Sequence, residues 1–340
     1  MYEYKYAFFY GELMNIELKY KFNHRISLIL LSVVTLLFGA VGFVYRAIGF
    51  LTIPFIVALL SMLMCIDKKR IVTATVTGIL LVAEICVSLY DYFTLITLSS
   101  FLISVLLSYY FLKGKDKAEC ALFSTTLLAL LFFVGAALYI IGKYDVSTLP
   151  EIIDSYLSIY EDFKAETIAS IYSMSVNTEN TTEVFTTEYL NAFFDAYLNC
   201  TVALVCILAF SIVGIAFKLF SALIRKYTVE QDKIVEWRFL PSSVFAYFYF
   251  ILAILSVISV DTESALVISI INLYLIFMYV FAYVGYRFIN ANFKSKGKNF
   301  NFIFLIMIVA FSSIAIQILA LIGAYATANR AKISKNTDHT

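Results

Sequence analysis

Residues 119–141 read ECALFSTTLLALLFFVGAALYII, a stretch whose only charged residue is Glu119 at its edge. A helix needs about 20 mostly apolar residues to cross a bilayer. Eight further stretches of this kind lie at 26–45, 48–66, 71–90, 94–112, 199–220, 243–260, 265–286 and 301–325. The sequence therefore predicts an all-α, polytopic transmembrane helical bundle of about nine spans, in a range of eight to ten.

The overall composition supports a membrane protein and argues against several other classes. Hydrophobic residues make up 62% of the 340, and the mean hydropathy is +0.88, more apolar surface than a water-soluble fold can hide. The net charge of +1 gives no reason to expect nucleic acid as a partner. The five cysteines form no CxxC pair and the two histidines, His24 and His339, lie near the termini. We therefore expect no metal site and no cofactor.

The spacing of the apolar stretches predicts four regions. These are an N-terminal membrane half at 1–142 with about five spans, an external acidic helical segment at 143–198, a C-terminal membrane half at 199–328 with about four spans, and a polar tail at 329–340. Only a short turn at Arg46 joins the first two spans. They form either a tight helical hairpin or one that does not cross fully.

The basic residues predict how the chain is oriented. Nineteen of the 25 Lys and Arg fall in segments on one side of the predicted spans. Because cytoplasmic loops are enriched in Lys and Arg, we expect a cell-membrane protein with a cytoplasmic N-terminus and an extracellular segment at 143–198. Nine crossings leave the basic C-terminal tail outside, so either one span is miscounted or the tail is an exception.

The external segment carries ten acidic residues between Asp145 and Asp195. Apolar residues between Pro150 and Tyr172 have the spacing of an amphipathic helix that lies on the membrane surface or caps the bundle. A polar link from Asn177 to Thr187 follows. We expect the next helix to run unbroken into the sixth span.

The third span has one polar face. Thr73, Thr77, Glu84, Ser88 and Asp91 fall within a narrow arc at 100° per residue. A carboxylate within the hydrocarbon costs a few kcal/mol, about 2.5–3.5 on the insertion scale for charged residues. We therefore expect Glu84 to face the bundle interior or a wet cavity.

Two later spans carry amides at a similar predicted depth. Glu84, Asn272 and Gln317 each lie six or seven residues below the predicted outer surface, about 10 Å at 1.5 Å per residue. The predicted ligand-binding residues of one outward-facing pocket are Glu84, Thr77, Ser88, Asn272 and Gln317. Alternatively, Asn272 and Gln317 only join helices through hydrogen bonds. Ser100, Ser104 and Ser108 form a small-residue face suited to close helix packing.

The C-terminal half resembles a known family. The features are Phe239-Leu240-Pro241 before a span, Asn272 followed by Val284-Gly285, and Leu321-Ile322-Gly323 followed by Asn329-Arg330. Over roughly the last 150 residues they resemble the YybS-like family of uncharacterised polytopic membrane proteins of Gram-positive bacteria. That family is distantly like the substrate-binding subunits of energy-coupling-factor transporters, which implies a role in ligand binding.

Two functions follow as expectations. The first is a small-molecule binding or transport subunit, whose partners would be the lipid bilayer, a small-molecule ligand and other membrane or cytoplasmic subunits. The alternative is a non-transporting membrane scaffold, or an envelope-growth or cell-division factor that acts through protein partners. The chain has no GxxxxGK[ST], HExxH or GxSxG motif, so we do not expect an enzyme and assign no catalytic residue.

Overall fold

The computed structural model describes residues 24–67, 70–87, 95–113, 117–175, 186–227, 241–258, 264–297 and 301–329, and all regular secondary structure in these residues is helical. In chain order the elements are α1 (His24–Val44), the 3-10 helix η1 (Arg46–Thr52), α2 (Ile53–Ile66), α3 (Ile71–Val87), α4 (Leu95–Leu112), α5 (Lys117–Tyr144), α6 (Leu149–Ser175), α7 (Thr187–Asn199), α8 (Thr201–Tyr227), α9 (Ser243–Ile258), α10 (Ala265–Ser295) and α11 (Asn301–Ala328). For these residues the predicted all-α class is confirmed.

Within the described parts of the chain, six helices are long and apolar enough to cross a membrane. They are Arg25–Val44, Gly49–Ile66, Leu95–Leu112, Lys117–Tyr144, Thr201–Arg225 and Ala265–Phe293. Three shorter apolar helical stretches are Ile71–Cys86, Ser243–Ile258 and Ile314–Ala328. Every predicted span thus falls on helix. Six of them meet the length of a spanning helix, and the count of nine crossings stays a prediction.

The first two predicted spans form a helical hairpin, as either alternative requires. α1 and α2 pack against each other, and η1 makes the turn between them. Pro54 lies in the first turn of α2, where its missing N–H leaves no hydrogen bond unmade.

The helices group into two compact units. The first comprises Met1–Leu131 with Ser211–Arg238, and the second comprises Phe132–Phe210 with Phe239–Thr340. α5 and α8 each contribute residues to both. This grouping does not test the region boundaries predicted at 142, 198 and 328.

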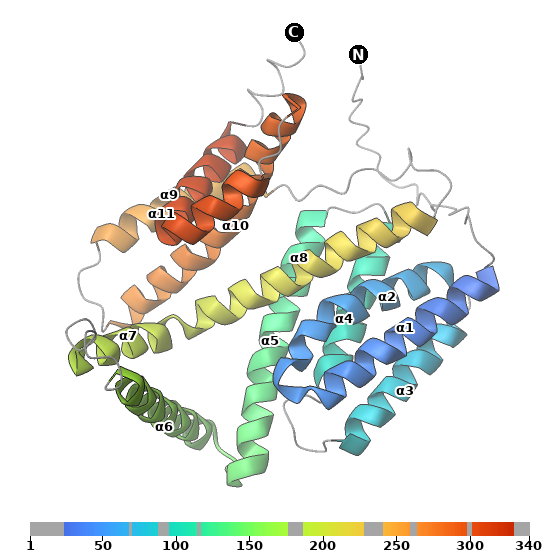
Figure 1. Cartoon of the computed structure of the whole chain (residues 1–340), viewed down its shortest axis with the longest axis horizontal. Coiled ribbons are helices and arrows are strands. Elements are labelled where there is room, and N and C mark those ends of the chain that lie inside the picture. The colour runs from blue at the N-terminus through green and yellow to red at the C-terminus, as the bar shows by residue number, and fades with distance from the viewer. Residues whose placement is uncertain are drawn as a thin grey trace. The chain divides into compact units, whose positions relative to one another are not determined.

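The first unit is built around α2, which packs against α1, α3 and α4 (Figure 1). Every residue of α2 except Phe55 is buried. The predicted small-residue face of α4 lies against it. The Ser104 hydroxyl donates to the Val57 carbonyl oxygen at 3.1 Å, and the Ser108 hydroxyl lies 3.4 Å from the Met64 sulfur. Small side chains allow this close approach, as the sequence predicted.

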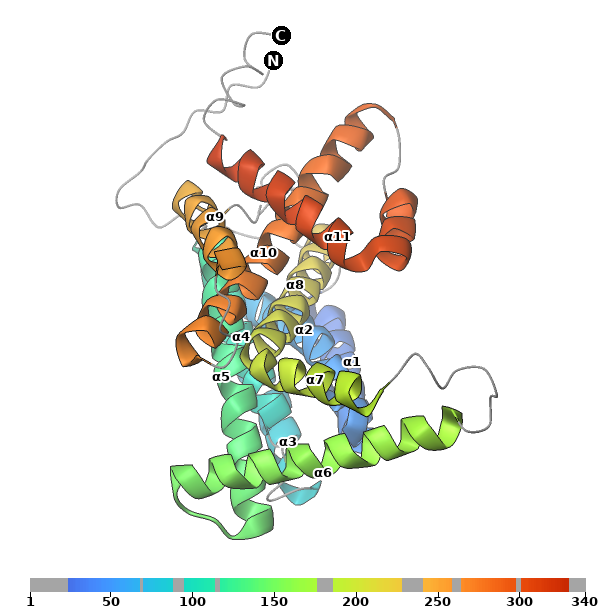
Figure 2. The same cartoon turned by 90° about the vertical axis from the view of Figure 1, so that its left-hand side faces the viewer.

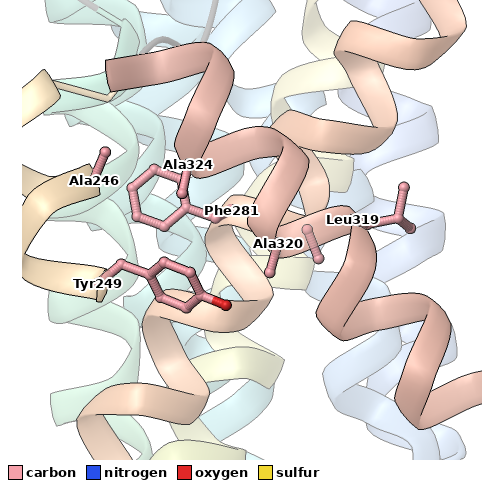
Figure 3. Close-up of a cluster of buried hydrophobic side chains, with 7 residues drawn as sticks. Ala246, Tyr249, Phe281, Leu319, Ala320 and Ala324 are labelled. Carbon is pink, nitrogen blue, oxygen red and sulfur yellow. The ribbon is translucent and has the colours of Figure 1, made fainter. Parts of the chain in front are cut away.

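The second unit has its core where α9, α10 and α11 meet. Its buried residues are Ala246 and Tyr249 from α9, Phe281 and Ala282 from α10, and Leu319, Ala320 and Ala324 from α11 (Figure 3). The Tyr249 and Phe281 ring centroids lie 5.3 Å apart. The alanines leave room for these rings, so large and small side chains interdigitate.

α10 and α11 make their closest approach at Gly285 and Gly323. A Cβ atom on Gly285 would lie 2.0 Å from the Leu319 carbonyl oxygen, and one on Gly323 would lie 2.0 Å from the Phe281 carbonyl oxygen. Backbone atoms cannot move aside as a flexible side chain can. The crossing therefore requires glycine on both helices.

The predicted external segment contains two helices, α6 and α7, which pack side by side (Figure 2). The helix expected between residues 150 and 172 is confirmed as α6. The polar link from 177 falls largely outside the described residues. The expected unbroken helix into the sixth span is wrong, because α7 ends at Asn199 and α8 begins at Thr201.

The glycine crossing yields a stability prediction. We expect Gly323→Ala to lower the free energy of unfolding by about 1–3 kcal/mol, because the added methyl group overlaps the α10 backbone. The measurement is the unfolding midpoint of the purified protein in detergent. Gly214→Ala is the matched control, since a Cβ there meets open space, and alanine favours a helix by about 0.5–1 kcal/mol. Equal midpoints for the two variants would contradict the prediction.

Candidate functional site

Glu84 is buried as the sequence predicts, and its carboxylate binds the first turn of the next helix. The side chain is 1% exposed. Glu84 Oε1 accepts a hydrogen bond from the Ile96 N–H at 3.0 Å, and Oε2 accepts one from the Thr97 N–H at 3.0 Å. The first N–H groups of a helix have no partner within that helix. Glu84 therefore acts as a cap for α4 supplied by another helix.

The hydrogen bonds place Glu84 at the level of the first turn of α4. The third span is expected to reach residue 90, and its residues from 88 on lie outside the described residues, so the predicted depth of Glu84 stays a prediction. A negative charge is favoured at the N-terminal end of a helix. The start of α4 therefore accounts for the position of this carboxylate.

The rest of the polar face also points inward where it is described. Thr73 and Thr77 are buried, and the Thr77 hydroxyl donates to the Thr73 carbonyl oxygen at 2.9 Å. This bond satisfies Thr77 within α3 and leaves it no need for a ligand. Ser88 and Asp91 lie outside the described residues.

A second carboxylate, which the sequence analysis missed, caps α3 in the same way. Asp67 follows α2 and is buried, and its Oδ2 atom accepts a hydrogen bond from the Thr73 N–H at 3.0 Å. The signal in the sequence is an acid a few residues before an apolar helix.

Asn272 joins α10 to the break between α7 and α8. Its Oδ1 atom accepts from the Ala203 N–H at 2.8 Å, and its Nδ2 atom donates to the Asn199 carbonyl oxygen at 2.7 Å. In an unbroken helix those two backbone groups, four residues apart, would bond to each other. The Asn272 amide instead lies between them. This insertion explains why the predicted continuous helix breaks at Cys200.

Other polar side chains of α10 and α11 have different surroundings. Tyr279 and Tyr283 of α10 both lie edge-on to the Phe210 ring of α8, at centroid distances of 6.1 and 6.0 Å. Gln317 of α11 is exposed. The amide of Gln317 thus stands on the surface of an apolar helix, whereas that of Asn272 is bound by backbone.

The predicted pocket residues fall into different units. Glu84 and Thr77 belong to the first unit, and Asn272 and Gln317 to the second. Within its own unit, each of Glu84, Thr77 and Asn272 has a backbone partner. The common pocket stays a prediction. Among the described residues, no group of three His, Cys, Asp or Glu side chains could hold a metal ion.

Polar contacts between described residues hold the α6–α7 hairpin. The Tyr160 hydroxyl donates to the Phe194 carbonyl oxygen, Lys164 Nζ lies 2.7 Å from Asp195 Oδ1, and the Tyr172 and Thr187 hydroxyls lie 2.7 Å apart. The hydrogen bond to Asp195 raises the pKa of Lys164, so the ammonium form is favoured. The two helices therefore form a defined hairpin.

Glu151 fixes the start of α6. Its Oε2 atom accepts from the N–H groups of Thr148 and Ser147 at 3.0 and 3.1 Å. These bonds lower the pKa of Glu151 because they favour the charged carboxylate. Thr148 and Glu151 have the spacing of a capping box, which marks the helix start in the sequence.

Comparisons with known proteins find no matching family model, no matching curated protein and no matching solved structure. The fold defines the class by itself. Six long apolar helices make this chain a multi-pass α-helical membrane protein, for which the lipid bilayer is the required surroundings.

The contact of Glu84 with α4 gives a second prediction. We expect Glu84→Leu to lower the free energy of unfolding by about 2–3 kcal/mol, because it leaves buried N–H groups without an acceptor. Glu84→Gln keeps one acceptor oxygen and should lose less. Thermal unfolding of the purified variants in detergent measures both. If Leu is tolerated as well as Gln, the carboxylate does not hold the start of α4.

Proposed function

We propose that this chain is a non-transporting membrane scaffold, whose helical bundle anchors an acidic hairpin that binds a basic protein partner. The observation that carries this proposal is the charged face of α6. The exposed carboxylates are Glu151, Asp154, Glu161, Asp162 and Glu166. At 100° per residue they fall within about 140° of arc. A surface of one charge sign attracts and orients a partner of the opposite sign.

The balance of charge on the hairpin favours an external cation. Lys164 is the one basic residue in the described parts of α6 and α7, and it is paired with Asp195. Lys164 also lies 3.7 Å from Glu161 Oε2. The described parts of these helices hold no second basic residue to neutralise Glu151, Asp154, Asp162 and Glu166. With the orientation proposed from the basic segments, this face lies outside the cell and the N-terminus lies in the cytoplasm.

The membrane-embedded polar side chains are consistent with a scaffold. The Glu84 carboxylate and the Asn272 amide both bind backbone groups of neighbouring helices. Side chains used in this way hold a bundle in one arrangement. An envelope-growth or cell-division factor that works through protein contacts would need this rigidity and no catalytic group.

Photo-crosslinking tests the scaffold proposal. A benzoyl-phenylalanine at Ser158, an exposed position within the acidic arc, should give a discrete crosslinked species in native membranes. Charge reversal in Asp154→Lys with Asp162→Lys should abolish it, whereas Asp154→Glu with Asp162→Glu should preserve it. High salt should weaken it because exposed charges are screened.

Two crosslinking results would contradict the scaffold proposal. A crosslink that survives charge reversal does not depend on the acidic face. A crosslink that forms equally from Ile251, an exposed residue on the apolar helix α9, reflects abundance in the membrane. Either result overturns the proposed docking role of α6.

A second candidate is the small-molecule binding or transport subunit. The specific observation in its favour is Gln317, an exposed amide on an apolar helix that needs a polar neighbour within a bilayer. The resemblance to the YybS-like family supports the same candidate, and membership in that family is likewise a proposal. The glycines of that resemblance, Gly285 and Gly323, are also explained by helix packing.

Native mass spectrometry of the purified chain tests this candidate. If Glu84 anchors a ligand, the wild-type protein should carry a small-molecule adduct that folded Glu84→Gln protein lacks. Thr75→Ala, at an exposed position of the same helix, should keep the adduct. An adduct that persists in Glu84→Gln removes Glu84 from any binding site.

A further inference from the structure

An exposed aromatic surface crosses the α6–α7 hairpin. We use the name aromatic patch for Phe163 of α6 and Phe193 and Tyr197 of α7, arranged beside the buried ring of Phe194. Ring centroids lie 6.3 Å apart for Phe163 and Phe194, 5.7 Å for Phe193 and Phe194, and 6.5 Å for Phe193 and Tyr197. The contacts are continuous, so the patch is one surface made by two helices.

The aromatic patch is exposed although its centre is buried. Phe163 is 56% exposed, Phe193 54% and Tyr197 50%, whereas Phe194 is 7% exposed. Tyr189, one turn before Phe193, is 57% exposed and extends the same face of α7. Contiguous exposed aromatic surface of this kind marks a contact with a membrane or another protein.

The hairpin contacts keep the aromatic patch on the surface. The bonds from Tyr160 to the Phe194 carbonyl and from Lys164 to Asp195 fix α7 against α6 at Phe194 and the residue after it. Neither helix can rotate to bury these rings without breaking one of these two hydrogen bonds. The patch must therefore be covered by something outside the hairpin.

The chain itself places the aromatic patch near the membrane. α8, which begins at Thr201, is one of the six spanning-length helices, and Tyr197 precedes it by four residues. At 1.5 Å per residue this is about 6 Å along a helix. α6 follows another such helix, α5, after only four residues. Both ends of the hairpin are thus tied to membrane spans.

The break at Cys200 lets α7 leave the direction of α8. The Asn272 amide replaces the backbone bond between Asn199 and Ala203, and the helix axis changes direction there (Figure 2). A helix that turns at the end of a span can lie along the bilayer surface with its apolar side down. Asn272 holds α7 in this turned position.

We infer that the aromatic patch is a membrane-interface anchor, with its rings among the lipid headgroups and upper acyl chains of the bilayer that the chain spans. Aromatic residues are favoured at this level. The acidic arc of α6 is centred about 130° from Phe163, and Glu188 lies about 140° from Phe193 on α7. Because these carboxylates carry negative charge, zwitterionic lipid suits the hairpin better than anionic lipid. This inference does not depend on the proposed protein partner.

Brominated-lipid quenching of a single tryptophan tests the anchor in the full-length chain. Trp237, the only tryptophan, is replaced by Phe, and Phe193→Trp is added. The protein is reconstituted into phosphatidylcholine vesicles brominated near the top or near the bottom of the acyl chain. Glu188→Trp is the matched control, since it lies about 140° from Phe193 on the same helix.

We expect Phe193→Trp to be quenched roughly threefold more than Glu188→Trp, and more by the upper bromines than by the lower ones, because an interfacial helix buries its apolar face about 5–10 Å deep. Phe163→Trp should likewise be quenched more than its control, Ser158→Trp. This second pair of variants tests the inference if Phe193→Trp does not fold. Replacing half of the phosphatidylcholine with phosphatidylglycerol should not increase the quenching of either patch tryptophan.

Equal quenching of the patch and control tryptophans overturns the inference. So does protection of Phe193→Trp that appears only at high protein-to-lipid ratio, because a second copy of the chain would then cover the aromatic patch. The charge-reversal variant Asp154→Lys with Asp162→Lys should leave the quenching unchanged. Failure of the anchor and failure of the protein-docking proposal are therefore distinguishable.

Discussion

Inside an apolar bundle, the N–H and C=O groups at helix ends must find partners within the protein, because water does not reach them. This chain meets that requirement with side chains borrowed from other elements. Asp67 binds the start of α3, Glu84 binds the start of α4, and Asn272 binds both backbone groups at the α7–α8 break. Each polar residue thereby fixes where a helix begins or bends, and the close packing around α2 and at the α10–α11 crossing depends on those positions.

This use of polar groups bears on function. A carboxylate in the membrane is expensive to retain, so it is commonly interpreted as part of a ligand or proton pathway. Glu84 offsets that cost through charge-assisted hydrogen bonds to the α4 backbone, which are among the stronger ones in proteins. A ligand at Glu84 would have to displace or share those amides. For this reason the structural role of Glu84 comes first, and the scaffold proposal is placed ahead of transport.

The sequence predicted what depends on local pattern and missed what depends on distant contacts. Apolar length identified the helices, and 100° periodicity correctly turned Thr73, Thr77 and Glu84 inward. The partners of Glu84 could not be predicted, since Ile96 and Thr97 belong to the next helix and no local periodicity links them to Glu84. The break at Cys200 carries no Gly or Pro signal. Its cause, Asn272, is 73 residues from Asn199, and no single-sequence pattern links the two.

The α6–α7 hairpin carries an acidic arc and an aromatic patch, and one orientation at the membrane suits both. Its acidic arc favours water and a cationic partner, while the aromatic patch favours the interface between headgroups and acyl chains. If the rings of Phe163 and Phe193 enter that interface, rotation of α6 about its own axis is no longer free. The carboxylates of Asp154, Glu161 and Asp162, which lie about 100–180° from Phe163 around the helix, must then face away from the lipid. Lipid contact on one face would thus set the direction in which the other face meets a protein, and the Lys164–Asp195 pair would couple the two helices that carry them.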